Sequence, residues 1–271
     1  MNNIQIKFSL SEKVAVVTGA LGLLGRQHCM ALSEAGAIVI VCDLDRVKCD
    51  EFANELPGIA HGFQLDVTVK NCILNLKTFI QHRYGRLDIL VNNAAINDMF
   101  ENRNAAFESS KFENYPLEMW DKSIKVNLTG MFLCSQMLGK LMFERKQGSI
   151  INIASTYGVV APDQKLYTRP DGTQPFYKSP VYSVTKGAVI AFTKYLAAYW
   201  GNSGIRVNTL SPGGVENGQE EYFIKKYSDK TPLGRMAKAD DYMGAIVYLA
   251  SDASGYVTGA NLIVDGGWTI C

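Results

Sequence analysis

Tyr182 and Lys186 stand four residues apart in the segment 181–201, where apolar residues recur with helical spacing. Positions i and i+4 share one helix face, so the lysine ammonium would lie beside the tyrosine phenol. A neighbouring positive charge stabilises the phenolate and lowers the pKa of the phenol from about 10. Such a tyrosine can act as an acid or a base near neutral pH, although most Tyr–Lys pairs of this spacing are surface contacts.

A glycine loop, TGALGLLG over 18–25, follows the β-branched run 14–19 and precedes a helical pattern. A strand, a glycine turn and a helix N-terminus in this order can hold a pyrophosphate. Gly19 would make the turn out of the strand, and Gly25 would let the helix pack closely. The spacing is G-x-x-G-x-x-G and not the usual G-x-G-x-x-G, which leaves the role of Gly22 open.

An acidic residue, Asp43, ends the second apolar run and follows Gly19 by 24 residues. A carboxylate there can accept hydrogen bonds from both hydroxyls of an adenosine ribose. The same carboxylate would repel the 2′-phosphate of NADP. No positive charge is available to bind that phosphate, because Leu44 follows Asp43 and the loop before Gly25 has no Arg or Lys. The sequence therefore predicts NAD rather than NADP as the cofactor. The alternative is that Asp43 caps the next helix.

Short apolar runs alternate with helical patterns along the chain. The runs are continuously apolar, which is typical of strands buried on both faces of a parallel sheet. We therefore predict an α/β fold, a doubly wound parallel sheet of about seven strands with helices on both faces, in a single domain over 1–271. The expected strands are 14–19, 37–43, 61–67, 86–95, 148–155, 205–214 and 260–267, and the expected helices are 23–36, 45–55, 71–83, 116–145, 181–201, 219–227 and 243–252.

Charge and composition argue against several classes of protein. Lys and Arg number 27 and Asp and Glu 26, without the clustered basic residues of a nucleic-acid binder. No apolar run approaches the ~18 residues that cross a membrane, and the N-terminus lacks the apolar region of a signal peptide. The six cysteines form no C-x-x-C pair and the three histidines are isolated. We expect reduced thiols, no metal site and a cytoplasmic protein.

Further motifs occur in an order that resembles the short-chain dehydrogenases/reductases over nearly the full chain. The resemblance implies a Rossmann-type domain that transfers a hydride between a nicotinamide cofactor and an alcohol or carbonyl. Each motif is weak alone, but the set is specific. The matching residues are Gly19, Gly22, Leu23 and Leu24 of the glycine loop, Asp66 and Val67 after the third strand, Asn93, Ala94 and Ala95 of the NNAA turn, Asn127 in KVN, Ser155 in NIAS, Tyr182 and Lys186, and Pro212, Gly213 and Val215 at the SPGG turn.

The resemblance implies a role for each catalytic candidate. Tyr182 would exchange a proton with the substrate oxygen, and Ser155 would hydrogen-bond that oxygen. Lys186 would bind the nicotinamide ribose, and Asn127 would hold a water in a proton relay behind the lysine. The other matching residues would bind NAD. Some proteins of this fold act as non-catalytic sensors, but these typically lose the tyrosine or the lysine, so we expect an enzyme.

The resemblance also implies a homotetramer, with a dimer as the alternative. The family assembles through its long helices, here 116–145 and 182–201, and through the C-terminal strand.

The chain departs from the family pattern at several places. Leu23 stands at the family's middle glycine, where it would pack below the pyrophosphate, and Ala95 replaces a glycine. After the SPGG turn, Val215 offers backbone groups where the family has a threonine, and Asn217 is an alternative replacement. Ser155 and Tyr182 are 27 residues apart, about twice the family's usual spacing, so 161–180 is expected to be an insertion beside the site.

Two polar stretches, 96–115 and 161–180, are long for loops in a compact domain, and 214–241 has the pattern of a lid. One interpretation is that their polar residues form the rim of a site for a hydrophilic or phosphorylated substrate. The alternative is a solvated hairpin or an oligomer contact. These residues are Arg103 and Lys111 in the first stretch, and Lys165, Tyr167, Arg169, Asp171, Tyr177 and Lys178 in the second.

The substrate class is open at this point. A polar rim favours a sugar or an amino sugar, with or without a phosphate, and the chain resembles a branch associated with bacterial flagellin modification and nonulosonic acid pathways. The alternative is a 3-oxoacyl-thioester or gluconate-type reductase. The direction of the reaction is not predicted.

Overall fold

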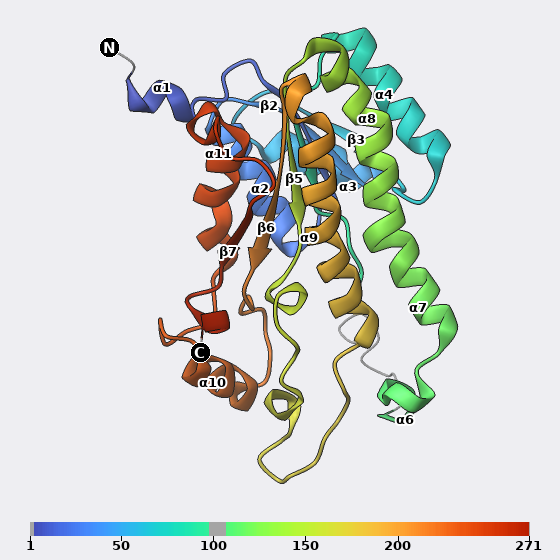
Figure 1. Ribbon diagram of the computed structural model, residues 1–271, viewed down its shortest axis with the longest axis vertical. Helices are drawn as coiled ribbons and strands as arrows, with labels where there is room; N and C mark the ends of the chain where they lie inside the picture. Colours follow the sequence, from blue (N-terminus) through green and yellow to red (C-terminus); the bar gives the residue numbers. More distant parts are fainter. Residues whose placement is uncertain (1–2, 98–106, 271) are drawn as a thin grey trace.

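Seven parallel strands form one sheet in the order β3-β2-β1-β4-β5-β6-β7 (Figure 1). The computed structural model describes residues 3–97 and 107–270, so Arg103 and Cys271 lie outside the described residues. The predicted fold class, a doubly wound parallel sheet covered on both faces, is confirmed. The strands are β1 (Val14–Thr18), β2 (Ile38–Asp43), β3 (Ala60–Gln64), β4 (Ile89–Asn92), β5 (Gly148–Ile153), β6 (Ile205–Pro212) and β7 (Asn261–Val264).

Helices cover both faces because the strands are apolar on both. α2, α3 and α11 pack on one face, and α4, α8 and α9 pack on the other. No helix in the described ranges is both long enough and apolar enough to cross a membrane. The helices are α1 (Ile4–Phe8), α2 (Leu23–Glu34), α3 (Arg46–Glu55), α4 (Lys70–Tyr84), α6 (Phe107–Ser110), α7 (Leu117–Ile124), α8 (Met131–Arg145), α9 (Pro180–Trp200), α10 (Glu221–Lys230) and α11 (Met243–Ala250).

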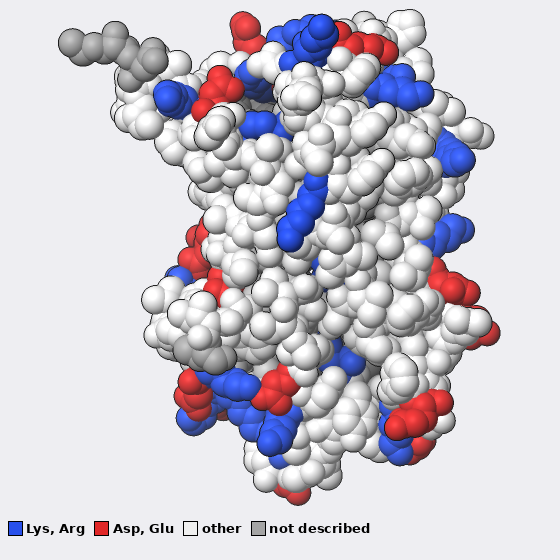
Figure 2. All heavy atoms as spheres, viewed as in Figure 1, with Lys and Arg blue, Asp and Glu red and all other residues white. Residues whose placement is uncertain are grey.

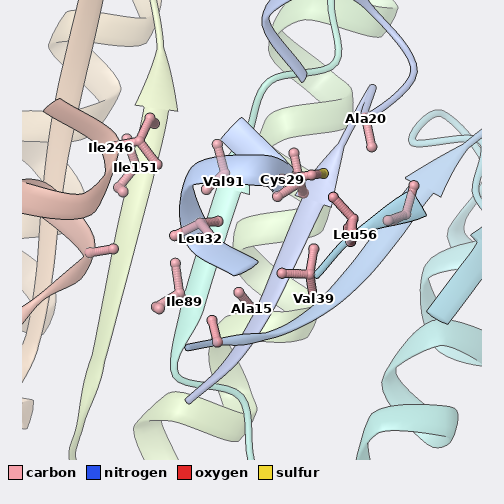
Figure 3. Close-up of a cluster of buried hydrophobic side chains, with 14 of the residues drawn as sticks. Ala15, Ala20, Cys29, Leu32, Val39, Leu56, Ile89, Val91, Ile151 and Ile246 are labelled. Carbon is pink, nitrogen blue, oxygen red and sulfur yellow. The ribbon is translucent and has the colours of Figure 1, made fainter. Parts of the chain in front are cut away.

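The core beneath α2 shows how the strands are held. Figure 3 shows Cys29 and Leu32 of α2 lying over Val39 and Val91 of the sheet, and all four side chains are fully buried. Burying an aliphatic side chain of this size stabilises the fold by about 1.5–3 kcal/mol. This packing fixes α2, and with it the glycine loop at its N-terminus, against β1.

The order of the strands reverses between β1 and β4. β2 lies on one side of β1, and β4 lies on its other side. In an open parallel sheet, the crevice beyond the carboxyl ends of the strands at such a point is the usual binding site. Thr18 and Asn92, which end β1 and β4, stand at this crevice.

The helix expected over 116–145 is present from Leu117 to Arg145, but it is not regular throughout. Between α7 and α8 the chain makes a π turn, Lys125–Gly130, which contains Asn127. A π turn adds one residue to a helical turn and is frequent at functional sites. The apolar spacing of this segment fits a regular helix equally well, so the sequence carries no local signal for the turn.

His28 is a buried polar group on α2, and it predicts a sensitivity to acid. Neither ring nitrogen has a hydrogen-bond partner among the described residues, and burial lowers the pKa of His28 to about 3. The unfolded chain takes up a proton near pH 6.5, whereas the folded chain does not. The free energy of unfolding therefore falls by about 1.4 kcal/mol for each pH unit below about 6.5, down to about pH 3.

Urea unfolding at pH 7, 6 and 5 checks this expectation against the His28→Met variant. The variant lacks the titrating ring, so its stability should fall less steeply over this range. Equal slopes for both proteins would contradict the assignment to His28.

Candidate active site

A cleft of about 360 Å³ opens at the carboxyl ends of the strands and collects many of the predicted residues. Its lining includes Leu23, Leu24, Asn93, Ala95, Ser155, Tyr182, Lys186, Pro212, Gly213, Val215 and Asn217. The other predicted residues are not part of this lining; they are Gly19, Gly22, Asp43, Asp66, Val67, Ala94 and Asn127.

Ser155 follows β5 in extended conformation and begins a short 3-10 turn, Thr156–Gly158. Its Oγ accepts a hydrogen bond of 3.2 Å from the backbone N–H of Tyr157. Gly158 presses this turn against α9, because a Cβ on Gly158 would lie 2.6 Å from the carbonyl carbon of Lys186. The glycine therefore sets the separation of Ser155 from α9. Gly158 is not among the predicted site residues. Its only signal in the sequence is its position three residues after Ser155.

Tyr182 lies in the first turn of α9, which begins at Pro180, a residue suited to that place. Its side chain is half-buried and reaches the cleft. Burial raises the pKa of the Tyr182 phenol, and a hydrogen bond with Ser155 lowers it by a smaller amount. The pKa is therefore raised, and not lowered as expected from the Tyr–Lys spacing, and the hydroxyl is protonated at neutral pH.

Lys186 lies one turn further along α9 and is buried. Its Nζ donates a 2.8 Å hydrogen bond to the carbonyl oxygen of Ile153 and lies 5.7 Å from the centroid of the Tyr182 ring. Burial lowers the pKa of Lys186 to about 8. The ammonium therefore stays mostly protonated at pH 7 and provides a positive charge beside Tyr182, as the i, i+4 spacing predicts.

Asn127 is buried on the π turn and links two parts of the site. Its Oδ1 accepts the N–H of Ile96 at 2.8 Å, and its Nδ2 donates to the carbonyl oxygen of Ile96 at 3.0 Å. The same Nδ2 donates to Oγ1 of Thr185 on α9 at 3.3 Å. Asn127 thus ties the chain beyond β4 to the helix that carries Tyr182 and Lys186; its role in a water relay remains a prediction.

The glycine loop is shaped so that only glycine fits at two positions. Gly19 has a φ of +62°, and a Cβ there would lie 2.7 Å from Cα of Ala94. A Cβ on Gly25 would lie 2.2 Å from the carbonyl oxygen of Gly19. Nδ2 of Asn93 donates to the carbonyl oxygens of Thr18 and Gly19, at 3.0 and 2.8 Å. The loop is therefore a rigid cradle before the N-terminus of α2, and it fits the pyrophosphate of a dinucleotide.

The shifted middle glycine has a simple structural outcome. Gly22 is the N-cap of α2, and a Cβ there would meet the Gly19 carbonyl oxygen at 3.4 Å, an ordinary contact. Leu23 begins the helix, is 43% exposed and faces the cleft. Its expected place below the pyrophosphate stays a prediction.

Asp43 is held at the glycine loop. Its two carboxylate oxygens accept the N–H groups of Leu21 and Leu44, at 2.9 and 2.8 Å. The alternative role of Asp43 as a helix cap is wrong, because Asp45 caps α3 through the N–H of Lys48. The acid stands at the end of β2, where a ribose-binding carboxylate is expected.

Asp66 and Val67 follow β3. Oδ1 of Asp66 accepts the N–H and the hydroxyl of Thr68, at 2.8 and 2.7 Å, and so closes the turn. Val67 packs on the π turn, because a Cβ on Gly130 would lie 2.6 Å from its Cγ2.

The segment after β6 begins the far wall of the cleft. The N–H of Gly213 donates to the carbonyl oxygen of Val264 at 2.9 Å, and the N–H of Gly214 donates to the Tyr227 hydroxyl at 2.6 Å. Val215 pairs with Ala237 in an isolated bridge. The lid segment is thus anchored at both ends, and α10 confirms the helix expected within it.

The insertion 161–180, the long loop between β5 and α9 in Figure 1, contains residues that line the cleft and residues that do not. Tyr167 and Lys178 line the cleft. Arg169 instead pairs with Glu220 at 3.5 Å, and Tyr177 stacks on Phe107 at 5.7 Å. Asp171 accepts hydrogen bonds from Thr173, Lys165 is exposed, and Lys111 pairs with Glu108.

The same insertion packs against α10 through one apolar cluster. Because part of the insertion is buried, it forms a wall of the cleft rather than a solvated hairpin; its place in an oligomer contact stays a prediction. The buried members of the cluster are Leu166, Tyr167, Phe223, Tyr227, Met236 and Trp268.

The chain is similar in sequence to known proteins over nearly its full length. A family model described as Enoyl-(Acyl carrier protein) reductase matches residues 19–269. The chain is 34% identical over 279 residues to D-threitol dehydrogenase of Mycolicibacterium smegmatis, across 99% of this chain and 97% of that protein. It is 34% identical over 268 residues to a 3-oxoacyl-[acyl-carrier-protein] reductase of Thermotoga maritima, across 96% of this chain and 99% of that protein.

The chain is also similar in fold to solved structures. The crystal structure of a gluconate 5-dehydrogenase from Burkholderia cenocepacia in complex with NADP and tartrate superposes with a TM-score of 0.84. It is 30% identical in sequence, and the match covers 99% of this chain and 100% of that one. The sequence motifs, the sheet order and these relatives together show that the chain belongs to the short-chain dehydrogenase/reductase family of enzymes, which use a nicotinamide cofactor to oxidise CH–OH groups or to reduce the corresponding carbonyls.

Proposed function

We propose that this enzyme transfers a hydride between NAD(H) and an alcohol or carbonyl of a small polyhydroxylated substrate, a sugar, an amino sugar or one of their phosphates. The observation that carries the proposal is one cleft lined by Ser155, Tyr182 and Lys186, in which the buried ammonium of Lys186 lies beside the Tyr182 ring. Its volume of about 360 Å³ must accept the nicotinamide ring as well, which leaves room for a small substrate only.

The residues of the cleft carry the proton chemistry. Ser155 holds the substrate oxygen beside Tyr182, and the Tyr182 hydroxyl gives its proton to a carbonyl or takes one from an alcohol. Lys186 stabilises the phenolate that the proton transfer leaves. When bound, the nicotinamide ring supplies or accepts the hydride. Asn127 holds the chain that joins these groups and is proposed to support a water behind Lys186.

We propose NAD as the preferred cofactor because the carboxylate of Asp43 ends β2 beside the glycine loop, where it would accept the ribose hydroxyls and repel a 2′-phosphate. Gly19, Gly22, Leu23 and Leu24 would hold the pyrophosphate at the start of α2. Asp66 and Val67 would border the adenine, and 93–95 and 212–215 would border the nicotinamide half.

The Asp43→Ser variant is expected to lose the preference for NAD over NADP. The substitution removes the negative charge that repels a 2′-phosphate and the acceptor for the ribose hydroxyls. The ratio of kcat/KM for NAD over NADP should fall at least about tenfold, or ~1.4 kcal/mol. Asp45→Ser is a matched control, since it removes a carboxylate from the cap of α3. An unchanged ratio in the Asp43 variant would contradict the proposal.

A thioester reductase is the second candidate. Its support is the 3-oxoacyl relative together with the apolar side chains of Phe223 and Met236 in the lining. The membership in a flagellin-modification branch stays a prediction, and the relatives reported above are named for polyols, sugar acids and thioesters.

A substrate screen tests the proposed function. NADH formation is followed at neutral pH with polyols, aldonates, sugar phosphates, amino-sugar phosphates, nucleotide sugars and 3-hydroxyacyl thioesters, and each is repeated with NADP. Turnover of sugars or polyols that is lost in Tyr182→Phe supports the proposal. Turnover of thioesters alone would replace it with the second candidate. NAD binding without any turnover would favour a sensor.

We propose a homotetramer, with a dimer as the alternative, and expect light scattering to give four times the chain mass of 29.9 kDa. Figure 2 shows that the middle of the face over α8 and α9 is largely uncharged. Phe132, Phe143, Tyr195 and Tyr199 are 43–66% exposed on these helices, and the two tyrosines stack at 6.0 Å. Exposed aromatic side chains on paired helices favour association. A monomer mass would contradict the proposal.

A further inference from the structure

Tyr157 brings a second phenol to the cleft, beside Tyr182. It lies two residues after Ser155 on the turn Thr156–Gly158, and its backbone N–H donates to Oγ of Ser155 at 3.2 Å. Its side chain lines the cleft together with that of Tyr182. The Lys178 ammonium lies 5.9 Å from the centroid of the Tyr157 ring and 4.7 Å from that of the Tyr182 ring, so the two rings are neighbours.

Aromatic packing holds the Tyr157 ring in place. Trp268 meets it edge-on, with the ring centroids 5.7 Å apart, and Trp268 is itself stacked on Tyr227 at 5.4 Å. Trp268 and Tyr227 belong to the buried cluster that joins the insertion to α10, and Tyr157 packs against this cluster. A hydroxyl on a ring held in this way is preorganised for a ligand, because little side-chain entropy is lost on binding.

Tyr167 supports the Tyr157 hydroxyl from the insertion. A hydrogen bond joins the two hydroxyl oxygens, which lie 3.2 Å apart. Tyr167 is 3% exposed and packs on Phe176 and Phe223, with ring centroids 5.1 and 5.3 Å away. Tyr157 is only partly buried. Tyr157 is therefore the member of the pair that meets a ligand in the cleft, and Tyr167 lies behind it.

The pair of hydroxyls has one donor more than its mutual hydrogen bond uses. Each phenol carries one O–H donor as well as acceptor lone pairs. Burial raises the pKa of Tyr157 to about 12 and that of Tyr167 well above its usual value, so both protons stay in place at neutral pH. One proton serves the bond between the two oxygens, and neither hydroxyl has another hydrogen-bond partner within residues 3–97 and 107–270. Because a buried polar group needs a hydrogen bond, the second proton is available to an acceptor in the cleft.

We propose that the Tyr157 hydroxyl, supported by that of Tyr167, binds a second hydroxyl of the substrate next to the group that reacts, so that the enzyme selects vicinal diols and α-hydroxy ketones over monoalcohols and simple ketones. This inference rests on the proposed function and narrows its substrate class. Tyr157 lies on the turn that Ser155 begins and beside the Tyr182 ring, so the bound hydroxyl is close to the reacting carbon. A 3-hydroxyacyl thioester has no hydroxyl next to its reacting carbon and gains nothing from this contact.

Matched pairs of small ketones test the proposal in the intact enzyme. The pairs are hydroxyacetone with acetone and acetoin with butanone, which differ by one hydroxyl next to the carbonyl. Each ketone is measured as a substrate with NADH, for kcat/KM, and as a competitive inhibitor of the sugar or polyol that the substrate screen identifies. Loss of a hydrogen bond to a buried donor predicts a preference of roughly 10- to 100-fold for the hydroxy ketone.

The variants Tyr157→Phe and Tyr167→Phe assign this preference to the pair. The hydroxyl also makes the neighbouring carbonyl more reactive, so the change of the ratio on substitution, and not the ratio alone, measures the contact. Tyr157→Phe should lower the ratio about tenfold or more, mainly through KM and the inhibition constant, and Tyr167→Phe should lower it less. Tyr177→Phe is the control, since it removes a hydroxyl of the same insertion that lies outside the cleft lining.

Three results would overturn the proposal. One is a wild-type enzyme that neither reduces nor binds the hydroxy ketones better than the simple ketones, a measurement that does not depend on a variant folding. Another is an unchanged ratio in Tyr157→Phe. The third is an equal fall in kcat for both members of each pair with a shifted pH profile, which would make Tyr157 a residue that tunes Tyr182. A wild-type enzyme without turnover of any sugar or polyol in the substrate screen would instead be a failure of the proposed function.

Discussion

Replacing Tyr182 with phenylalanine is expected to lower kcat by roughly 10²- to 10⁴-fold, the usual contribution of a positioned acid or base. The change removes only the hydroxyl, and the half-buried ring keeps its place on α9. NADH affinity should stay within the error of the measurement, because the glycine loop and Asp43 are untouched. Steady-state kinetics and titration of NADH fluorescence check the two halves of this expectation.

Tyr256→Phe is the matched control for the tyrosine variant. This residue is fully exposed, so loss of its hydroxyl should leave kcat unchanged. If Tyr182→Phe kept more than about a tenth of the wild-type kcat, the proton would pass through another group. If it lost NADH binding as well, the defect would lie in folding and not in chemistry.

Gly25→Ala is expected to weaken NADH binding at least about tenfold, which corresponds to ~1.4 kcal/mol. The new Cβ would lie 2.2 Å from the carbonyl oxygen of Gly19 and 2.8 Å from Cα of Ala20. Both are backbone atoms, so the start of α2 and the loop must separate. This separation spoils the cradle and should also lower the free energy of unfolding by about 1–3 kcal/mol. Fluorescence titration and urea unfolding measure these effects.

Gly244→Ala provides the comparison. It makes the same substitution within α11, where a Cβ meets nothing within 4 Å among the described residues. Alanine is the better helix former, so this variant should be as stable as the wild type or more stable. Equal NADH affinity in the two glycine variants would show that the close approach at Gly25 does not shape the site.

The strands of the sheet were predictable because burial on both faces makes each of them a continuous apolar run in the sequence. Strands such as Val14–Thr18 and Ile38–Asp43 are buried on both faces, so their sequences are continuous apolar runs that any reader can find. The glycine loop and the spacing of Tyr182 and Lys186 were predictable because both depend on neighbours in sequence. Gly158 was not, because its constraint is contact with a helix nearly 30 residues away.

The π turn could not be read from the sequence, because the contacts that accompany it join residues far apart in the chain. Residues 125–130 fit a regular helix in composition and spacing. What accompanies the extra residue is the pairing of Asn127 with Ile96 and Thr185, which come from two other parts of the chain. Spacing along one helix carries no information about such partners.

The composition of the insertion 161–180 predicted that it is polar, but not which of its side chains point into the cleft. Lys165, Arg169 and Lys178 are equally basic in sequence, yet only Lys178 reaches the cleft. Arg169 instead pairs with Glu220, the N-cap of α10, and Lys165 is exposed. Assigning every polar residue of a loop to the rim of the site therefore includes residues that do not line the cleft.

The packing of the insertion on α10 also constrains how substrate range can change. Lys226 of α10 donates to the carbonyl oxygens of Thr168 and Lys165, at 2.6 and 3.2 Å, and Lys230 pairs with Asp163. Grafting a different loop between β5 and α9 would remove the hydrogen-bond and ion-pair partners of Lys226 and Lys230. It would also expose the apolar face of α10 to solvent. Insertion and helix therefore form one exchangeable module, and a transplant of specificity into a relative must carry both segments together.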